Sequence, residues 1–182
     1  MRIRAAIAVP AVSAVVSAVV SAAAAVLLLT APQSRAAAGP DRPVRCAEKS
    51  LTLRAQAAPG DPTVLRAAVT NRGARACLVD RVPTVTFGDL DGAALPMPPG
   101  GIGTYRLAAG GTAYADVRTI ADPADPEARR VDAVTVAASA AQWGQSFTAA
   151  RLGTGRQVLV WEPVTTWWQR SAKAADRIIG LR

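Results

Sequence analysis

Apolar and polar residues alternate along much of the chain, most regularly in residues 51–57 and 64–71. In the second run, Leu65, Ala67 and Val69 fall on one face, and polar or small residues fall on the other. A period of two is typical of a β-strand with one face in the core and one in water. The Pro-Gly-Asp-Pro sequence between the runs is typical of a turn, so the pattern predicts two neighbouring antiparallel strands.

Shorter runs of the same kind follow, separated by Gly, Pro and Asp. The clearest of them covers residues 112–120. An Asp-Gly pair at 91–92 is a strong hairpin signal, and we expect it to join strands at 84–87 and 93–97. No helical periodicity is present before Pro163. The remaining predicted strands are 76–79, 103–108, 131–138, 145–149 and 157–161.

This spacing of short strands predicts an all-β fold, and in particular an immunoglobulin-like antiparallel β-sandwich. A length of 182 residues fits one such domain, which we place at residues 46–164. Residues 37–45 contain Gly and Pro without periodicity and are predicted to be a linker. Aromatic residues make up only 4% of the chain, so we expect a core of Val, Leu and Ala that depends on extra stabilisation.

Residues 1–36 have the features of an export segment. Arg2 and Arg4 precede an uncharged run at 5–34, and small residues that could form a cleavage site end at Ala36. The run is also long enough to cross a bilayer as a helix, so an uncleaved membrane anchor is the alternative to a signal peptide. Both interpretations place the domain outside the cytoplasmic membrane, secreted or anchored.

The chain is basic, with a net charge of +8 that falls to +5 without Arg2, Arg4 and Arg35. It contains 19 arginines and 2 lysines, a ratio that in an Ala-rich chain we attribute to a GC-rich genome and not to phosphate recognition. We therefore expect no nucleic-acid partner.

Cys46 and Cys77 are the only cysteines in the chain. In an exported protein, such a pair is most simply a disulfide. A redox or metal role would call for a Cys-x-x-Cys motif or accompanying histidines, and the sequence has neither.

The sequence contains no histidine, which removes the usual general base and the commonest transition-metal ligand. None of the serines of the expected mature chain has a glycine-elbow context. Carboxylates gather at 89–91 and at 122–127, where a weak calcium site is the alternative to ordinary turns. We predict no catalytic residue, no metal site and no cofactor.

The last segment, residues 165–182, predicts a short basic amphipathic helix. On a helical wheel, Trp167 and Trp168 share a broad apolar face with alanines and isoleucines, opposite Arg170, Lys173 and Arg177. The helix could pack on the domain, or these five residues could contact an anionic membrane surface or a partner.

Several short motifs resemble a known family. They are Cys46, the sequence Thr-Asn-Arg-Gly at 70–73, Cys77-Leu78, the sequence Val-Pro-Thr-Val at 82–85, Leu107 and Gly111. The arrangement is similar to that of secreted actinobacterial proteins known as the domain of unknown function 4232 family. The resemblance covers residues 46–164 and implies an immunoglobulin-type sandwich outside the membrane. The chain departs from the family pattern in having Arg-Val-Pro in place of Gly-Tyr-Pro and in lacking a second cysteine pair.

Because the family has no established activity, the resemblance implies a fold and a compartment but no reaction. We expect an exported, non-enzymatic module of the cell envelope that binds an envelope component or has a structural role. The alternative is an extracellular enzyme or inhibitor of an unrecognised type, which a cleft lined by carboxylates would favour.

Overall fold

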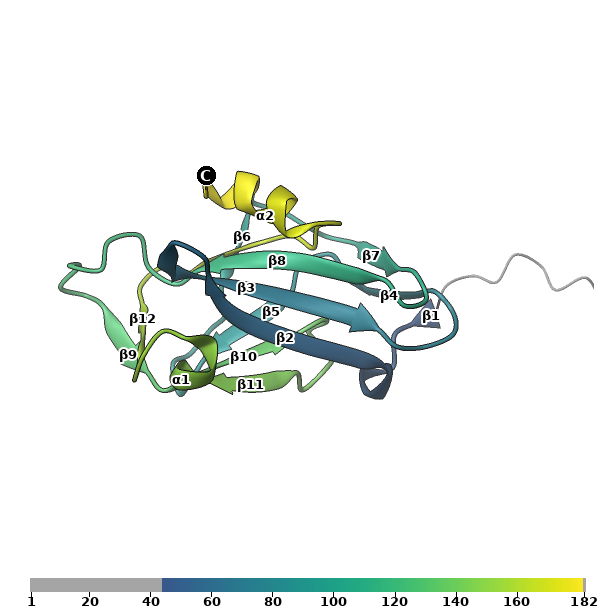
Figure 1. The fold of residues 1–182 in the computed structure, drawn as a ribbon, viewed down its shortest axis with the longest axis horizontal. Coiled ribbons are helices and arrows are strands. Elements are labelled where there is room, and N and C mark those ends of the chain that lie inside the picture. The colour runs from purple at the N-terminus through teal and green to yellow at the C-terminus, as the bar shows by residue number, and fades with distance from the viewer. Residues whose placement is uncertain (1–43, 182) are drawn as a thin grey trace, which may run out of the picture. The chain divides into compact units, whose positions relative to one another are not determined.

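The computed structural model describes residues 44–181, which are hereafter called the domain (Figure 1). The predicted signal peptide or anchor at 1–36 lies outside this range, as does the predicted linker up to residue 43. Strands make up most of the regular structure, as expected for an all-β fold. Within residues 44–181, no helix is long and apolar enough to cross a membrane.

The largest sheet has five strands, and the two most regular sequence patterns lie at one edge of it. The predicted antiparallel pair is confirmed, with Leu53 opposite Val69. The next strand is also antiparallel, with Val69 opposite Ala113. In spatial order the sheet consists of β2 (Leu51–Ala58), β3 (Asp61–Asn71), β8 (Thr112–Arg118), β13 (Val164–Thr166) and β6 (Leu95–Met97).

Three smaller sheets complete the domain. One contains β11 (Gln145–Thr148), β10 (Ala133–Ala137) and β5 (Thr84–Phe87). A second contains β1 (Val44–Arg45), β4 (Cys77–Asp80) and β7 (Thr104–Leu107). The third pairs β12 (Val158–Val160) with β9 (Arg129–Val131).

The main core draws side chains from all four sheets. Val69 and Ala115 of the five-stranded sheet are buried in the same cluster as Val85, Val134 and Phe147 of the β11-β10-β5 sheet. Alanines at several inward positions have no exposed surface, in agreement with the small-residue core predicted from composition. The inward phase predicted for β3 is confirmed, and alternate residues of β2 and β8 also lie in the core.

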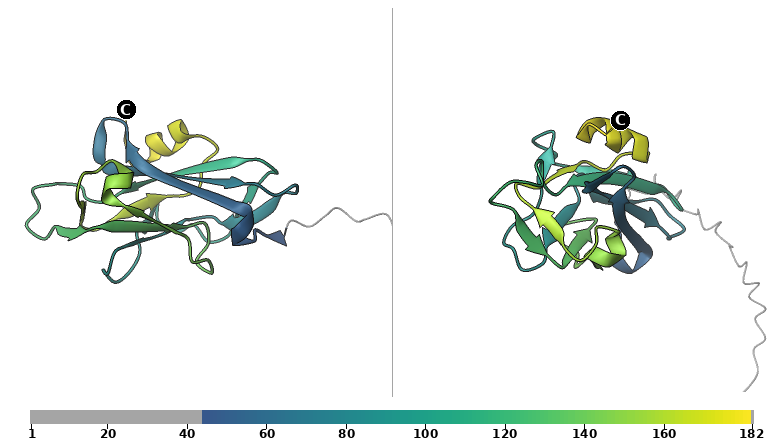
Figure 2. Two further views of the ribbon diagram at one scale, coloured as in Figure 1. Left: turned by 60° about the horizontal axis from the view of Figure 1, so that its bottom comes forward. Right: turned by 60° about the vertical axis from the view of Figure 1, so that its left-hand side comes forward.

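Two α-helices and one short 3-10 helix lie outside the strands. The 3-10 helix is η1 (Glu48–Ser50), and the α-helices are α1 (Ala149–Leu152) and α2 (Ala172–Ile179). Figures 1 and 2 show α2 on the outer side of the five-stranded sheet. The expectation of no helix before Pro163 is wrong for α1, because one turn is too short to produce a periodic pattern.

Two further expectations are corrected. The Asp-Gly turn at 91–92 does not form a hairpin, because β5 pairs with β10 whereas β6 pairs in parallel with β13. Turn chemistry reverses the chain but does not select the partner strand. Val44 and Arg45, assigned to the linker, instead form β1 opposite Cys77 and Leu78.

Candidate functional site

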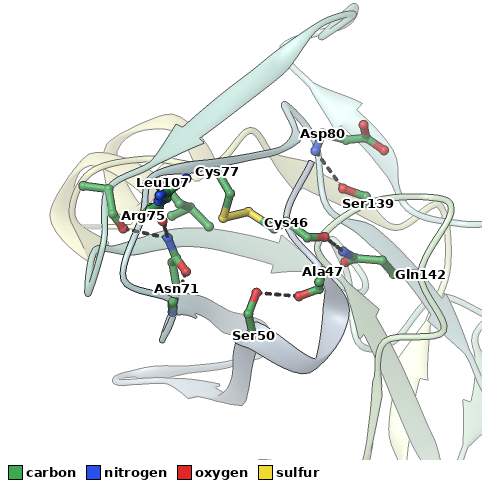
Figure 3. Close-up of a disulfide and its surroundings, with 12 residues drawn as sticks. Cys46, Ala47, Ser50, Asn71, Arg75, Cys77, Asp80, Leu107, Ser139 and Gln142 are labelled. Atoms are coloured by element: carbon green, nitrogen blue, oxygen red, sulfur yellow. Dashed lines mark hydrogen bonds between the residues drawn. A yellow bond between two sulfur atoms is a disulfide. The ribbon is translucent and has the colours of Figure 1, made fainter. Parts of the chain in front are cut away.

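The domain begins at a disulfide that ties its first strand to its fourth (Figure 3). Cys46 and Cys77 are bonded, with their Cα atoms 4.9 Å apart and each residue only 6% exposed. The bond therefore lies in the core and not on the surface. It confirms the predicted pairing, and we call this part of the domain the disulfide end.

Asn71 joins the two turns nearest to the disulfide. Its side chain is 1% exposed, and its amide nitrogen donates to the carbonyl oxygens of Arg75 at 2.8 Å and Ala108 at 3.1 Å. Its side-chain oxygen accepts a hydrogen bond from the Gly73 backbone N–H at 2.8 Å. A buried amide with satisfied donors and acceptor fixes the geometry of both turns.

The 139–144 loop, between β10 and β11, is held against the disulfide end by side-chain bonds. The Gln142 amide donates to the Cys46 carbonyl oxygen at 3.1 Å, as Figure 3 shows. The Ala140 N–H donates to an Asp80 carboxylate oxygen at 2.9 Å. The N–H groups of Trp143 and Gly144 donate to the Glu48 carboxylate at 3.4 and 2.6 Å.

The C-terminal segment continues the five-stranded sheet before it forms a helix. β13 pairs with β8, and Gln169 then forms a two-way bridge with Tyr114. Val164 lies opposite Arg118, so one strand has one residue more than the other between the two pairings, as in a β-bulge. The predicted boundary between residues 164 and 165 therefore falls inside β13.

The two tryptophans of this segment do not lie on the helix, and this corrects the helical-wheel interpretation. α2 begins at Ala172, after an N-cap at Ser171 whose hydroxyl accepts from the Ala174 N–H at 3.2 Å. Trp168 is 2% exposed and belongs to the main core. Trp167 is half-buried, and the Arg81 guanidinium lies 4.2 Å from its ring centre.

The helix packs on the sheet, one of the alternatives that the sequence left open. Ala175 and Ile179 are buried, and Ile179 shares a second apolar cluster with Ala58 and Val64. The three predicted contact cations are exposed: Arg170, Lys173 and Arg177. Membrane or partner contact through this segment stays a prediction, and among its predicted residues these cations are the ones on the surface.

A polar cluster lies beneath α2 on the outer face of the five-stranded sheet. Arg66 of β3 forms an ion pair with Asp116 of β8, at 3.1 Å, and a second one with Asp176 of α2. Asp116 is fully buried, and one of its oxygens has no partner among the described residues. The pKa of Asp116 is raised to about 6. Burial is the largest cause, and the nearby Asp176 adds to it, whereas the hydrogen bond from Arg66 acts in the opposite direction.

Comparison with known protein families shows which family the chain belongs to. The family model described as a domain of unknown function (DUF4232) matches residues 46–168, more than half of the chain. The chain belongs to this family. No curated protein and no solved structure matches it.

Most of the positions that carry the DUF4232 resemblance lie at the disulfide end, whereas Val-Pro-Thr-Val at 82–85 leads into β5. The cysteines form the bond, Asn71 joins the turns, and Leu107 pairs with Cys77 across β4 and β7. The backbone of Gly111 accepts from the Asn71 N–H at 2.9 Å. These positions thus have a structural role in holding one end of the domain together.

The two carboxylate clusters differ in their surroundings. Asp122 and Asp125 accept backbone N–H bonds two residues ahead, at 2.9 and 2.8 Å, which supports the turn interpretation. Asp89 and Asp91 instead line an open hollow of about 460 Å³ together with Glu162. The same hollow is lined by Arg129 and Trp161. Among the described residues, no group of three or more acidic or cysteine side chains is arranged to hold a metal ion.

The sequence predicted the disulfide correctly but missed the contacts of Asn71, the burial of Asp116 and the exposure of Trp143. The turn motif contained Asn71, yet its bonds reach a second turn more than 30 residues away. Asp116 lies on the outer face of β8, and its burial comes from α2, which covers that face. Trp143 had no signal in its neighbourhood, because the residues that position it are about 95 positions earlier in the chain.

Proposed function

We propose that this DUF4232 chain is an exported, non-enzymatic module of the cell envelope with an immunoglobulin-like sandwich, and that it binds an envelope component or has a structural role there. Such modules present loops at the ends of the sheets while the core stays constant. The resemblance to secreted actinobacterial proteins supports a location outside the cytoplasmic membrane.

The observation that carries this proposal is the Cys46–Cys77 disulfide. It is buried in the core at the point where the described chain begins, so the folded domain includes an oxidised bond. Disulfides persist in oxidising compartments and are rare in the reducing cytosol. The basic n-region with Arg2 and Arg4, followed by the uncharged run at 5–34, agrees with that location.

The roles of the polar residues at the disulfide end support a binding or structural role. Glu48, Asp80 and Asn71 each bind backbone groups of neighbouring turns and loops. The chain has no histidine to act as a general base. These side chains stabilise the shape of the domain, which is what a binding module requires.

A reporter fusion tests the location. Alkaline phosphatase folds to its active form only outside the cytoplasm, whereas β-galactosidase is active inside. Fused after Arg182 of the full chain, the phosphatase should be active and the galactosidase inactive. The opposite pattern would contradict export. Mass spectrometry of the N-terminus, with cell fractionation, then distinguishes a cleaved signal peptide from an uncleaved anchor.

The hollow at Asp89, Asp91 and Glu162 favours a second candidate, an extracellular enzyme or inhibitor. Paired carboxylates in a hollow are the arrangement that acid–base hydrolysis of glycosides uses. The test is incubation of the wild-type protein and the Asp91→Asn, Glu162→Gln double variant with cell-wall polysaccharide. Products formed by the wild type alone would support the enzyme. If chromatography shows no new products with either protein, glycosidase activity at this hollow is excluded.

A further inference from the structure

Trp143 is almost completely exposed although it is the largest kind of apolar side chain. Its exposed fraction is 92%, whereas Trp168 is 2% exposed. Among the described residues, the other strongly exposed large apolar side chains are Val44, Leu95 and Ile102. Val44 lies two residues before Cys46, whose carbonyl oxygen binds the 139–144 loop. Two of the four side chains are therefore close to the disulfide end.

The exposure of Trp143 does not come from a loose loop. Asp80, Glu48 and the Cys46 carbonyl hold the 139–144 loop at four backbone or side-chain donors. Gly144 has a φ of 75°, and a Cβ there would lie 2.4 Å from the Val136 carbonyl oxygen, so only glycine fits. The fold therefore holds an indole in solvent, where its burial against a membrane or another protein would be favourable.

The disulfide end carries a small excess of positive charge. Lys49 and Arg72 are exposed, and they are neighbours because the Arg72 guanidinium donates to the Lys49 carbonyl oxygen at 3.3 Å. The Arg45 side chain is 60% exposed and forms an ion pair with Asp80. The carboxylates of this end, Glu48 and Asp80, accept bonds from the 139–144 loop. Because Asp80 offsets Arg45, the excess of positive charge is one, from Lys49 and Arg72 against Glu48.

The described chain starts at this same end. Nine residues, 35–43, separate Val44 from the uncharged run at 5–34. A fully extended chain spans at most about 3.3–3.6 Å per residue, so this linker reaches roughly 30 Å. If the run is in a membrane, the disulfide end cannot be farther than that from the bilayer.

We propose that the disulfide end rests on an anionic lipid surface, with the Trp143 indole in the headgroup region and Arg45, Lys49 and Arg72 around it. Tryptophan is enriched at the membrane–water boundary, and lysine or arginine near an anionic leaflet adds attraction. The anchored form of the proposed function places the domain beside a membrane, so this inference rests on the proposed function with an uncleaved anchor. The proposal assigns membrane contact to the disulfide end, where Trp143 is exposed, and not to the C-terminal segment, where Trp168 is in the core.

Fluorescence quenching by labelled lipid tests the position of Trp143. The full chain is reconstituted in anionic vesicles that contain a lipid with a nitroxide close to the headgroup. The wild type and the Trp161→Phe control should lose part of their emission to the nitroxide. Trp143→Phe should lose this quenched component while keeping the melting temperature, because the side chain makes no buried contact. Quenching that is the same in Trp143→Phe and the wild type, or absent from both, overturns the proposal.

Two matched charge reversals test the electrostatic part. Each cation near an anionic surface contributes about a fivefold factor to binding. Lys49→Glu should therefore lower the ratio of quenched to unquenched Trp143 by at least about fivefold, and added salt should have the same direction of effect. Lys173→Glu changes the net charge equally, at an exposed position of α2, and should leave the ratio unchanged. Equal effects of both reversals would indicate non-specific attraction of the basic chain to the vesicles and would contradict a specific lipid-facing end. Failure here with an active phosphatase fusion would leave export intact.

Discussion

The disulfide end and the C-terminal segment contain the same kinds of residues in opposite arrangements. At the disulfide end, polar side chains bind the backbone of the 139–144 loop and Trp143 points into solvent. In the C-terminal segment, a bulge after β13 precedes Trp168, which lies in the core, and the cations of α2 remain outside. A tryptophan beside cations therefore does not identify a contact surface until its backbone is placed.

The difference has a physical origin in how each segment is fixed. Apolar burial fixes the C-terminal segment, through Trp168 in one cluster and Ile179 in another. Hydrogen bonds and a covalent bond fix the disulfide end, where they leave an apolar side chain free for other contacts. Substitutions should consequently have different effects at the two ends.

The largest effect is expected for Trp168→Ala. Removing a buried tryptophan costs about 3–5 kcal/mol through lost burial and the cavity that remains. Trp143→Ala is the matched control and should change the free energy of unfolding by less than about 0.5 kcal/mol, since it is a surface change. Urea unfolding followed by circular dichroism measures both. Similar losses of unfolding free energy in the two variants would contradict the difference between the two ends.

The next largest effect is expected when the disulfide is removed. Cys46→Ala with Cys77→Ala opens a loop with a sequence separation of 31 residues. In the chain-entropy model, this lowers the free energy of unfolding by about 3–4 kcal/mol. The same urea titration checks the loss, and free-thiol labelling of the denatured, unreduced wild type should find no thiol. A loss below about 1 kcal/mol would mean that Asn71 and the loop bonds hold this end without the disulfide.

A smaller effect is expected for Asn71→Ala. The change leaves the carbonyl groups of Arg75 and Ala108 without the amide donor, at a cost of about 1–3 kcal/mol. Amide hydrogen exchange should become faster at Gly73, whose N–H bonds to the Asn71 side-chain oxygen. Gly110, whose N–H bonds to the Asn71 backbone carbonyl oxygen, keeps its acceptor in the variant and should change less. Arg72→Ala, at the adjacent exposed position, should leave both amides protected. Unchanged exchange in Asn71→Ala would show that the backbone alone fixes these turns.

The last effect depends on pH and concerns the cluster under α2. Because the folded pKa of Asp116 is raised to about 6, above its unfolded value, its contribution to stability is complete below about pH 4. That contribution is lost as the pH rises through about 6. Asp116→Asn resembles the protonated form, so its melting temperature should gain on the wild type between pH 4 and 7. A difference that is constant over this range would contradict a raised pKa.

The strand faces could be predicted from the sequence because each strand of the β2-β3-β8 group has one side in the core. Val69 and Ala115 are inward for that reason, and their positions follow from alternation alone. The partners of β5 and β6 could not be predicted, since pairing depends on contacts that are distant in the sequence. Similarly, β1 has two residues, too few to show any alternation.

The disulfide could be predicted because the chain has only one pair of cysteines. The ends of α2 were also present in the sequence, as a serine cap at Ser171 and a glycine in the left-handed region at Gly180. These caps place Trp167 and Trp168 before the helix. The exposure of Trp143 had no such signal, because it results from bonds to Glu48 and Cys46.

Iodide quenching of tryptophan fluorescence in the folded full chain tests most directly whether the two ends use their tryptophans in opposite ways. Iodide is charged and reaches only indoles that are exposed to water. In vesicles without anionic lipid at high salt, Trp143→Phe should lose most of the fraction that iodide quenches, whereas Trp168→Phe should keep it. Loss of the quenched fraction in Trp168→Phe, with no change in Trp143→Phe, would contradict the account.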